Sequence, residues 1–256
     1  MHKHRFFAYI EIGDEGMVLN RKRLIFVLFL LLILCFLLMY KDNQYAEEKL
    51  NQTIQTNGTP VSSHTIIIDA GHGEPDGGAV SENGISEAEI NLSITLKLQK
   101  LLEQSGCNVI LTRSDENGIY DLDEESIRNK KVSDIKNRVE IAKTAEADCF
   151  ISIHLNKIPQ SQYSGWQTFY QSSKEDSKEL AYDIQNNLNY TIQKENKREI
   201  LPLSGKYIMD NVNIPTVTVE CGFLSNPEEE RMLQEEDYQE KLAWGIFTGI
   251  MDYFYN

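Results

Sequence analysis

The 256-residue sequence predicts an α/β fold: a three-layer sandwich in which helices flank a twisted, mostly parallel β-sheet, preceded by one N-terminal transmembrane helix. Three observations predict it. From about residue 65 onward, short apolar runs alternate with longer amphipathic segments, which is typical of βαβ units. Several of these runs end in a histidine or a carboxylate, at the sheet edge where sites form in parallel sheets. An unbroken apolar run at 24–40 precedes them all.

This N-terminal run has the length and flanking charges of a membrane anchor. Its seventeen residues would extend about 25 Å as a helix, near the lower limit for a bilayer core of about 30 Å. Arg21, Lys22 and Arg23 precede it, and such a cluster stays in the cytoplasm while the following chain is exported. The run has no polar face, which argues against a buried core helix.

No small-x-small cleavage site follows the run, so we expect an uncleaved signal-anchor, with cleavage as the open alternative. A start at Met17 in place of Met1 would bring the basic cluster close to the N-terminus. The residues after the run are rich in Gln, Asn, Thr and Glu and predict a flexible tether. We therefore expect a cytoplasmic segment at 1–23, a transmembrane signal-anchor at 24–40, a polar linker at 41–63 and a globular domain at 64–256.

The charge is distributed unevenly along the chain. The net charge is −14, yet residues 1–40 carry five Lys/Arg and three Asp/Glu, so the remaining residues carry −16. Such an acidic domain repels phosphates, and we expect no nucleic-acid partner. Its substrate is expected to be neutral, zwitterionic or cationic, or to be held by local contacts.

The first half of the domain contains two predicted strands and two predicted helices. Residues 65–69 (TIIID) form a short apolar run typical of a buried strand, and residues 87–104 carry apolar residues three and four positions apart, which indicates a helix. A second strand is predicted at 108–112 (NVILT). The polar stretch at 114–131 indicates a surface loop or a short helical insert, and 133–146 has helical spacing.

The second half continues the alternation. Residues 149–154 (CFISIH) and 216–220 (TVTVE) predict buried strands, and 166–170 predicts a further strand. Residues 177–192 predict a helix, and 237–254 predict a closing helix with apolar residues at helical spacing.

Four cysteines are present, and none forms a C-x-x-C pair, which disfavours a thiolate zinc site. Cys35 lies in the apolar N-terminal run. Cys107, Cys149 and Cys221 lie at the starts or ends of predicted strands, where we expect small buried residues. Their disulfide state stays open.

The polar residues at three strand ends suggest a catalytic site. His72 follows the first strand in DAGHG, His154 ends the third in SIHLN, and Glu220 ends a late strand in VECGF. In a parallel sheet these side chains project from one edge. Each alone would more often be an ordinary polar side chain, but three such strand ends together indicate function.

Glu87 is the fourth candidate, at the start of the first predicted helix. Ser86 and Glu89 fit a capping box, which would occupy Glu89 with the backbone and leave Glu87 free to point into the cleft beside His72. The other histidines of the chain have no comparable context and are not expected to be ligands. Asp69 and Asn156 are expected to hold the turns or to support the ligands through hydrogen bonds from behind.

Two histidines and a carboxylate are a common ligand set for catalytic zinc, with water in the fourth position. Zinc lowers the pKa of such a water toward about 7. Glu220 would then accept the proton of the water and pass it to a leaving nitrogen. The residues therefore predict metal-assisted hydrolysis.

Four blocks of the sequence resemble the zinc-dependent N-acetylmuramoyl-L-alanine amidases, which cut peptidoglycan between N-acetylmuramic acid and L-alanine. The blocks are IIIDAGHGEPDGGAV, GISEAEINLSITLKLQKLLEQSGCNVILTR, DCFISIHLN and IPTVTVECGFLSNPEEE, in the family's order. The resemblance covers roughly residues 65–255. It implies that His72, Glu87 and His154 bind zinc (Zn²⁺) and that Glu220 is the catalytic glutamate. Glu74 departs from the glycine usual in the family, but it removes no ligand.

Finer features are similar to the sporulation branch of this family, the germination-specific amidases. They are SIHLNKIPQSQYSGWQTFY, LPLSGKYIMDN and the N-terminal anchor without wall-binding repeats. This resemblance implies a role in spore cortex maturation, in which removal of the peptide leads to muramic-δ-lactam. It also implies a catalytic domain outside the cytoplasm, in the cortex between the two spore membranes. Peptidoglycan and the membrane are the expected partners, and the sequence identifies no regulatory protein.

Two enzymatic roles and two non-enzymatic ones compete. An autolysin for vegetative cell separation is the alternative role for the same chemistry. A non-catalytic wall-binding module on the same fold would be favoured if any of the four site residues were replaced, and none is. A nucleotide-binding regulator is disfavoured, because the glycine-rich stretch after the first strand does not complete G-x-G-x-x-G and no Walker sequence is present.

Overall fold

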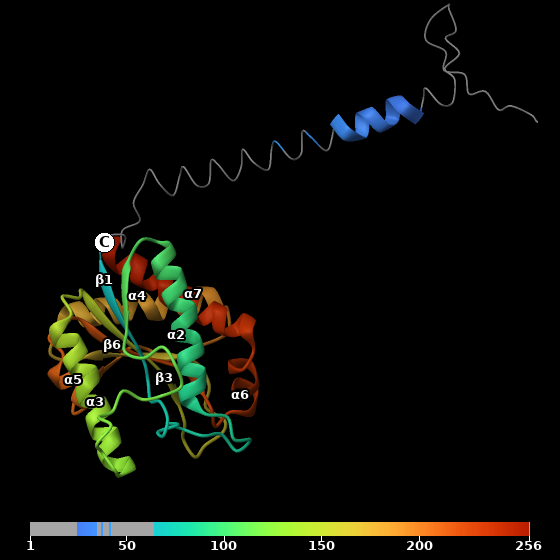
Figure 1. Cartoon of the computed structure of the whole chain (residues 1–256). Coiled ribbons are helices and arrows are strands. Elements are labelled where there is room, and N and C mark those ends of the chain that lie inside the picture. The colour runs from blue at the N-terminus through green and yellow to red at the C-terminus, as the bar shows by residue number, and fades with distance from the viewer. Residues whose placement is uncertain (1–24, 35–36, 38–40, 42–63, 256) are drawn as a thin grey trace, which may run out of the picture. The chain divides into compact units, whose positions relative to one another are not determined.

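The computed structural model describes residues 25–34, 37, 41 and 64–255 (Figure 1). The chain divides into two compact units, residues 1–57 and 58–256. In the first unit, residues 25–34 are helical with exposed apolar side chains. Among the described residues, no helix has both the length and the apolar character to cross a membrane. The predicted cytoplasmic segment at 1–23, residues 24, 35–36 and 38–40 of the predicted anchor and residues 42–63 of the predicted linker lie outside the described residues, and all three segments stay predictions.

The second unit is built on a mixed six-stranded sheet with the order β2-β1-β3-β6-β4-β5. All neighbouring pairs are parallel except β4 and β6, which are antiparallel. The prediction of a mostly parallel sheet is therefore confirmed. The strands are β1 (Thr65–Ala70), β2 (Asn108–Leu111), β3 (Cys149–Asn156), β4 (Gln167–Gln171), β5 (Leu201–Leu203) and β6 (Thr216–Phe223).

Helices cover both faces of this sheet, as the sequence predicts. They are α2 (Glu87–Gln104), α3 (Ile127–Thr144), α4 (Glu175–Ile192), α5 (Tyr207–Asn211), α6 (Pro227–Leu233) and α7 (Glu236–Tyr255). Figure 1 shows α3 and α5 on one side of the sheet, whereas α2, α4 and α7 lie on the other.

The side chains of β1 show why both faces must be covered. Ile66 and Ile68 pack into a larger core with residues of α2, α4 and α7, while Ile67 packs with Val139 of α3 and Phe150 of β3. Successive side chains of a strand point to opposite faces, so an unbroken run of isoleucines requires apolar partners on each. All three isoleucines are fully buried, and each contributes about 1.5–3 kcal/mol to folding.

Several element bounds differ from the predicted ones. β3 continues to Asn156 and β6 to Phe223, beyond the polar residues at which strands were expected to end. α3 begins at Ile127, inside the stretch expected to be a loop or short insert, because the Ser126 hydroxyl accepts a hydrogen bond from the Asn129 amide and caps it. β5, α5 and α6 were not predicted. Cys107, Cys149 and Cys221 are buried, as expected, and their disulfide state, which the sequence left open, is free in the structure.

Candidate active site

The turn after β1 carries His72 to the carboxyl edge of the sheet. The Gly71 amide donates to the carbonyl of Ile153 at 3.0 Å, which keeps the turn against β3. A Cβ at Gly71 would lie 2.4 Å from the ring of His154, so only glycine fits between the two histidines. His72 itself has φ 62°, an uncommon conformation for a residue with a side chain. The surrounding contacts must therefore hold it.

Two buried arginines provide these contacts. Arg138 of α3 donates to the carbonyls of Ala70 at 2.8 Å and His72 at 2.6 Å, and it forms an ion pair with Asp69. Arg113, after β2, donates to the carbonyl of Ala70 at 2.9 Å. Burial lowers the pKa of Arg138, but the opposing effect of Asp69 and Asp134 is larger and raises that pKa. The guanidinium of Arg138 therefore stays charged. Asp69 thus has the turn-holding role expected for it.

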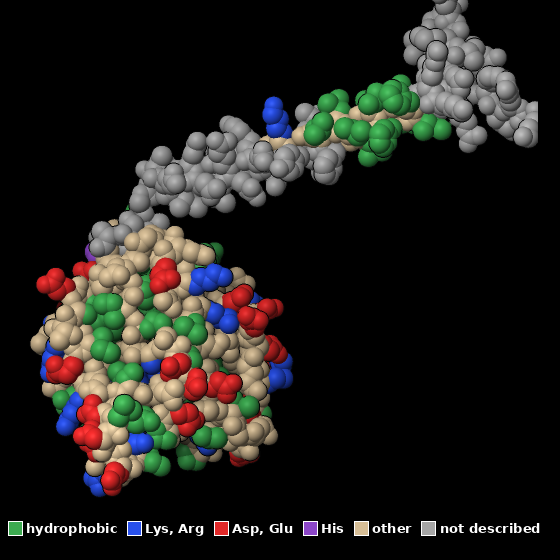
Figure 2. Space-filling view, in the orientation of Figure 1, with side chains coloured by type: hydrophobic (Ala, Val, Ile, Leu, Met, Phe, Trp, Pro, Cys, Tyr) green, Lys and Arg blue, Asp and Glu red, His purple; other side chains and the backbone are tan. Residues whose placement is uncertain are grey.

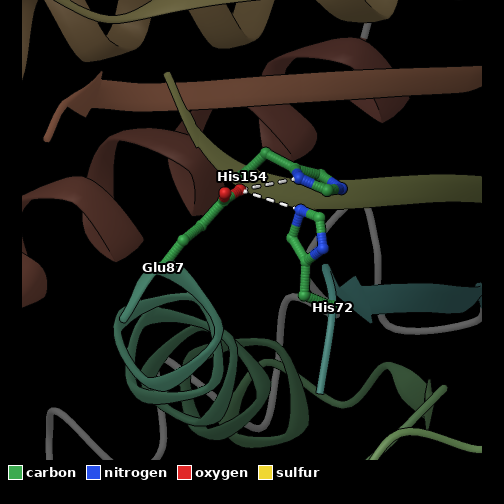
Figure 3. Close-up of side chains that lie close together, drawn as sticks. All are labelled: His72, Glu87 and His154. Atoms are coloured by element: carbon green, nitrogen blue, oxygen red, sulfur yellow. Dashed lines mark hydrogen bonds and ion pairs between the residues drawn. The ribbon is translucent and has the colours of Figure 1, made fainter. Parts of the chain in front are cut away.

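Glu87, the first residue of α2, joins the two histidines (Figure 3). Its Oε1 atom lies 2.9 Å from Nδ1 of His154 and 3.4 Å from Nε2 of His72. Backbone amides fix the carboxylate, since Leu155 donates to Oε1 at 3.0 Å and Ala79 donates to Oε2 at 2.8 Å. Only 3% of Glu87 is exposed. The structure thus brings the three predicted ligands together.

The predicted capping box at this helix start is wrong. Ser86 occupies the N-cap position, but its hydroxyl donates to the carbonyl of Gly77 at 2.9 Å and makes no cap hydrogen bond. The loop that carries Gly77 folds back onto the start of the helix, and the Ser86 hydroxyl therefore bonds to the Gly77 carbonyl and not to a backbone amide of the helix. Glu89 is exposed and is not engaged in a cap. The expectation that Glu87 and not Glu89 faces the cleft still agrees with the structure.

Asp76 is a site residue that the sequence analysis missed. Its Oδ2 atom lies 2.9 Å from Nδ1 of His72, and its Oδ1 atom lies 2.9 Å from the ammonium of Lys131 and accepts from the amide of Gly78 at 3.2 Å. A carboxylate on one ring nitrogen fixes the tautomer and leaves the other nitrogen available as a ligand. The sequence feature that could have identified Asp76 is its place four residues after His72 in a glycine-rich turn.

Glu220 lies beside His154 in the sheet register and lines the same cleft. Its Oε2 atom is buried and has no hydrogen-bond partner among the described residues. Burial raises the pKa of Glu220, and the negative charge of Glu87 adds to the rise against the opposing effect of His154. A carboxyl group of raised pKa without a fixed partner is suited to transfer protons.

The cleft that contains these groups has a volume of about 370 Å³. Its lining includes His72, Glu87, His154 and Glu220, together with residues of α3, Leu203 of β5 and residues 206–209. Glu74, which departs from the family pattern, is exposed and does not line the cleft. His64 stacks on Phe254 and pairs with Asp148, away from the cleft.

The donor atoms of this cluster fit a zinc ion. The three ligand atoms of His72, Glu87 and His154 lie within 4.8 Å of one another. A tetrahedral ion with bonds of about 2.0–2.2 Å requires ligand separations of roughly 3.4 Å, which small side-chain shifts would reach. Two imidazoles with one carboxylate are also the donor set that catalytic zinc uses.

The protonation of these groups is consistent with cation binding. Burial lowers the pKa of His72, but hydrogen bonds with Asp76 and Glu87 outweigh it and raise that pKa to about 9. Burial raises the pKa of Glu87, yet the two histidines hold it well below its ordinary value. Glu87 is therefore a carboxylate at neutral pH. A metal ion would displace the proton of His72 and take over the same partners.

A family model described as N-acetylmuramoyl-L-alanine amidase matches residues 66–252, most of the chain. The chain belongs to this amidase family. The amidase is 34% identical over 236 residues to the germination-specific N-acetylmuramoyl-L-alanine amidase of Bacillus subtilis, covering 91% of this chain and 96% of the relative.

Solved structures agree with this assignment. The amidase is 48% identical to the CwlD amidase of Clostridioides difficile, solved in complex with the GerS lipoprotein, with a TM-score of 0.73 over 74% of this chain and 98% of that one. It is 32% identical to the catalytic domain of CwlV from Bacillus (Paenibacillus) polymyxa, with a TM-score of 0.63 over 74% and 97% of the two chains. The resemblance expected from the sequence is confirmed, and the chain is a peptidoglycan amidase of the α/β fold seen in these structures.

Proposed function

We propose that this amidase is zinc-dependent, that His72, Glu87 and His154 bind the zinc, and that Glu220 is the catalytic acid and base. The observation that carries the proposal is the convergence of these four side chains. Three donor atoms meet within 4.8 Å, and the unpartnered carboxyl of Glu220 lines the same cleft. A non-catalytic wall-binding module would have no use for this combination.

Zinc supplies Lewis-acid chemistry in such a set, because it polarises a carbonyl oxygen and lowers the pKa of water toward about 7. Glu220 accepts a proton from the attacking water, whose oxygen adds to the carbonyl carbon of the muramic acid lactyl group. As the C–N bond breaks, Glu220 passes the proton to the nitrogen of L-alanine, which leaves as a free amine. Asp76 orients His72, and Arg138 holds the turn that carries it.

Digestion of purified peptidoglycan tests this function directly. The full-length protein, purified in detergent and loaded with zinc, should release stem peptides with a free L-alanine amino terminus, identified by mass spectrometry. Removal of zinc with a chelator should abolish the release, and added zinc should restore it. Release of glycan fragments without free peptides would contradict the amidase reaction, and chelator-resistant cleavage would contradict the zinc.

We infer that the amidase acts in spore cortex maturation, where it removes stem peptides on the route to muramic-δ-lactam. The support is its similarity to a germination-specific amidase of Bacillus subtilis and to the CwlD amidase of Clostridioides difficile. The alternative role is vegetative cell separation. A mutant that lacks the gene distinguishes the two roles by the muramic-δ-lactam content of its spores.

We also propose that residues 24–40 anchor the amidase in the membrane with its catalytic domain outside the cytoplasm, facing the cortex. The apolar run and the preceding basic cluster support this orientation. The linker at 41–63 would give a flexible reach of about 25 Å. A reporter that is active only in the cytoplasm should be silent when fused after Asn256, and an active fusion there would contradict the topology.

A lipoprotein partner is a further part of the proposal. CwlD of Clostridioides difficile was solved in complex with the GerS lipoprotein, and we propose that this chain binds a lipoprotein of its own on the outer side of the membrane. Affinity purification of the tagged amidase from sporulating cells should recover a lipoprotein. Its absence from purifications that retain active amidase would contradict a stable partner.

A further inference from the structure

The lining of the cleft that contains the histidines also includes a lysine. Lys206 precedes α5, is exposed and lines the same cleft as Glu220. Among the described residues, its ammonium makes no hydrogen bond and no ion pair. Its positive charge also acts on Glu220, where it opposes the rise in pKa that burial causes.

The backbone that carries Lys206 is fixed on both sides. The buried Gln171 amide donates to the carbonyls of Met209 at 2.7 Å and Val212 at 2.8 Å, which fastens the end of α5 to β4. The Gly205 amide donates to Asp210 at 3.2 Å and closes the turn before the helix. The backbone at Lys206 is therefore already ordered, and binding of a ligand by its side chain requires little further loss of backbone entropy.

The other cations of the cleft are already occupied. Lys131 pairs with Asp76 at 2.9 Å, and Arg138 is buried with Asp69 and Asp134. Figure 2 shows an acidic face of the domain, with carboxylates gathered near its centre, in keeping with the net charge of −14. An anionic group of a ligand would be repelled by a protein of this net charge unless a local cation received it. Among the described residues that line the cleft, Lys206 is the cation left for this purpose.

The position of Glu220 indicates which part of the substrate meets this lysine. In the proposed reaction, Glu220 gives its proton to the nitrogen of L-alanine, so that nitrogen must lie beside it. The stem peptide continues from this nitrogen, whereas the glycan continues from the carbonyl carbon on the other side of the broken bond. Because Lys206 lines the same cleft as Glu220 and its charge acts on that carboxyl group, we place the peptide, and not the glycan, toward the lysine.

We propose that Lys206 binds a carboxylate of the stem peptide, carried by the residue that follows L-alanine. This inference rests on the proposed amidase reaction and deepens it by assigning the peptide side of the cleft. It predicts that the enzyme distinguishes substrates in which this carboxylate is free from those in which it is amidated.

Two synthetic muramyl tripeptides test the assignment, identical except that the second residue carries either a free α-carboxylate or its amide. With the full-length, zinc-loaded protein, kcat/KM for the acid should exceed that for the amide by about two- to fivefold, the range of an exposed ion pair. Lys206→Met should abolish the preference, and Lys206→Glu should reverse it. Lys241→Met, on α7 outside the cleft, removes the same charge and should keep the wild-type preference.

The outcomes separate the two proposals. A preference that persists in Lys206→Met, or its absence in the wild-type protein, would overturn the role of Lys206 while leaving the amidase reaction in place. Cleavage of neither substrate at the amide bond by the wild-type protein would overturn the amidase reaction itself. Loss of the preference in Lys241→Met as well would show a general charge effect and would also overturn the assignment.

Discussion

The Asp76 carboxylate lies 2.9 Å from Nδ1 of His72 on one side and 2.9 Å from the ammonium of Lys131 on the other. The first contact orients the imidazole so that its Nε2 atom faces Glu87. The second links the orientation of the ring to α3. Asp76 is therefore a positioning residue, and it acts on the proposed metal site through His72.

We expect Asp76→Ala to lower zinc affinity by about 10- to 100-fold, the usual effect of losing a carboxylate behind a ligating histidine. Lys131→Ala removes the exposed partner of the same carboxylate and should change the affinity much less. Competition with a chromophoric chelator measures both variants. Unchanged affinity in Asp76→Ala would exclude this positioning role.

Glu87 and Glu89 offer a matched pair of adjacent carboxylates. Glu87→Ala should lose zinc and activity, because it removes a proposed ligand and the group that joins both histidines. Glu89→Ala should keep both and change stability by no more than about 0.5 kcal/mol, since Glu89 is exposed and caps nothing. The zinc content of the two variants, measured by atomic spectroscopy, shows which of the two carboxylates is needed for zinc binding. Full zinc occupancy in the Glu87 variant would overturn the ligand assignment.

Glu220→Gln should bind zinc normally and lose a factor of roughly 10² or more in turnover. The amide keeps the shape of the side chain but cannot accept the proton of the water. Zinc content, thermal stability and kcat should be measured on the same preparation. Normal turnover in a folded, zinc-loaded variant would remove Glu220 from the mechanism.

The sequence was sufficient to locate the four central side chains, because strand ends and a helix start are local features. His72, His154 and Glu220 follow apolar runs, and the parallel order of those runs places them at one edge. The prediction that Glu87 and not Glu89 faces the cleft agrees with the structure, but the reason given for it was wrong. The helix cap that was expected to occupy Glu89 is absent.

The supporting residues depend on contacts between distant segments, which no periodicity reveals. Arg138 contacts the His72 carbonyl across 66 positions of the chain, and its helix pattern gives no sign of that contact. β5 and α5 are too short for a periodic signal, with three and five residues. The position of Lys206 in the lining of the cleft therefore could not be predicted from the sequence.

Gly71 should be intolerant of any side chain. A Cβ there would lie 2.4 Å from the His154 ring, so Gly71→Ala must displace the side chain of this proposed ligand. We expect weaker zinc binding and a loss of about 1–3 kcal/mol in the free energy of unfolding. Gly84→Ala is the control, because it meets no atom within 4 Å and should lose stability through its positive φ while binding zinc normally. Equal zinc affinity in both variants would show that the contact with His154 is unimportant.

Removal of the gene distinguishes the two biological roles proposed for the chemistry. If the amidase matures the cortex, the mutant should form spores whose peptidoglycan contains little or no muramic-δ-lactam, and these spores should germinate poorly. The wild-type protein should restore both properties, whereas Glu220→Gln should restore neither, because the defect follows from the missing cleavage and not from the missing protein. Muropeptide analysis of purified spores measures the lactam. Spores with normal lactam, formed by vegetative cells that stay joined in chains, would assign the enzyme to cell separation instead.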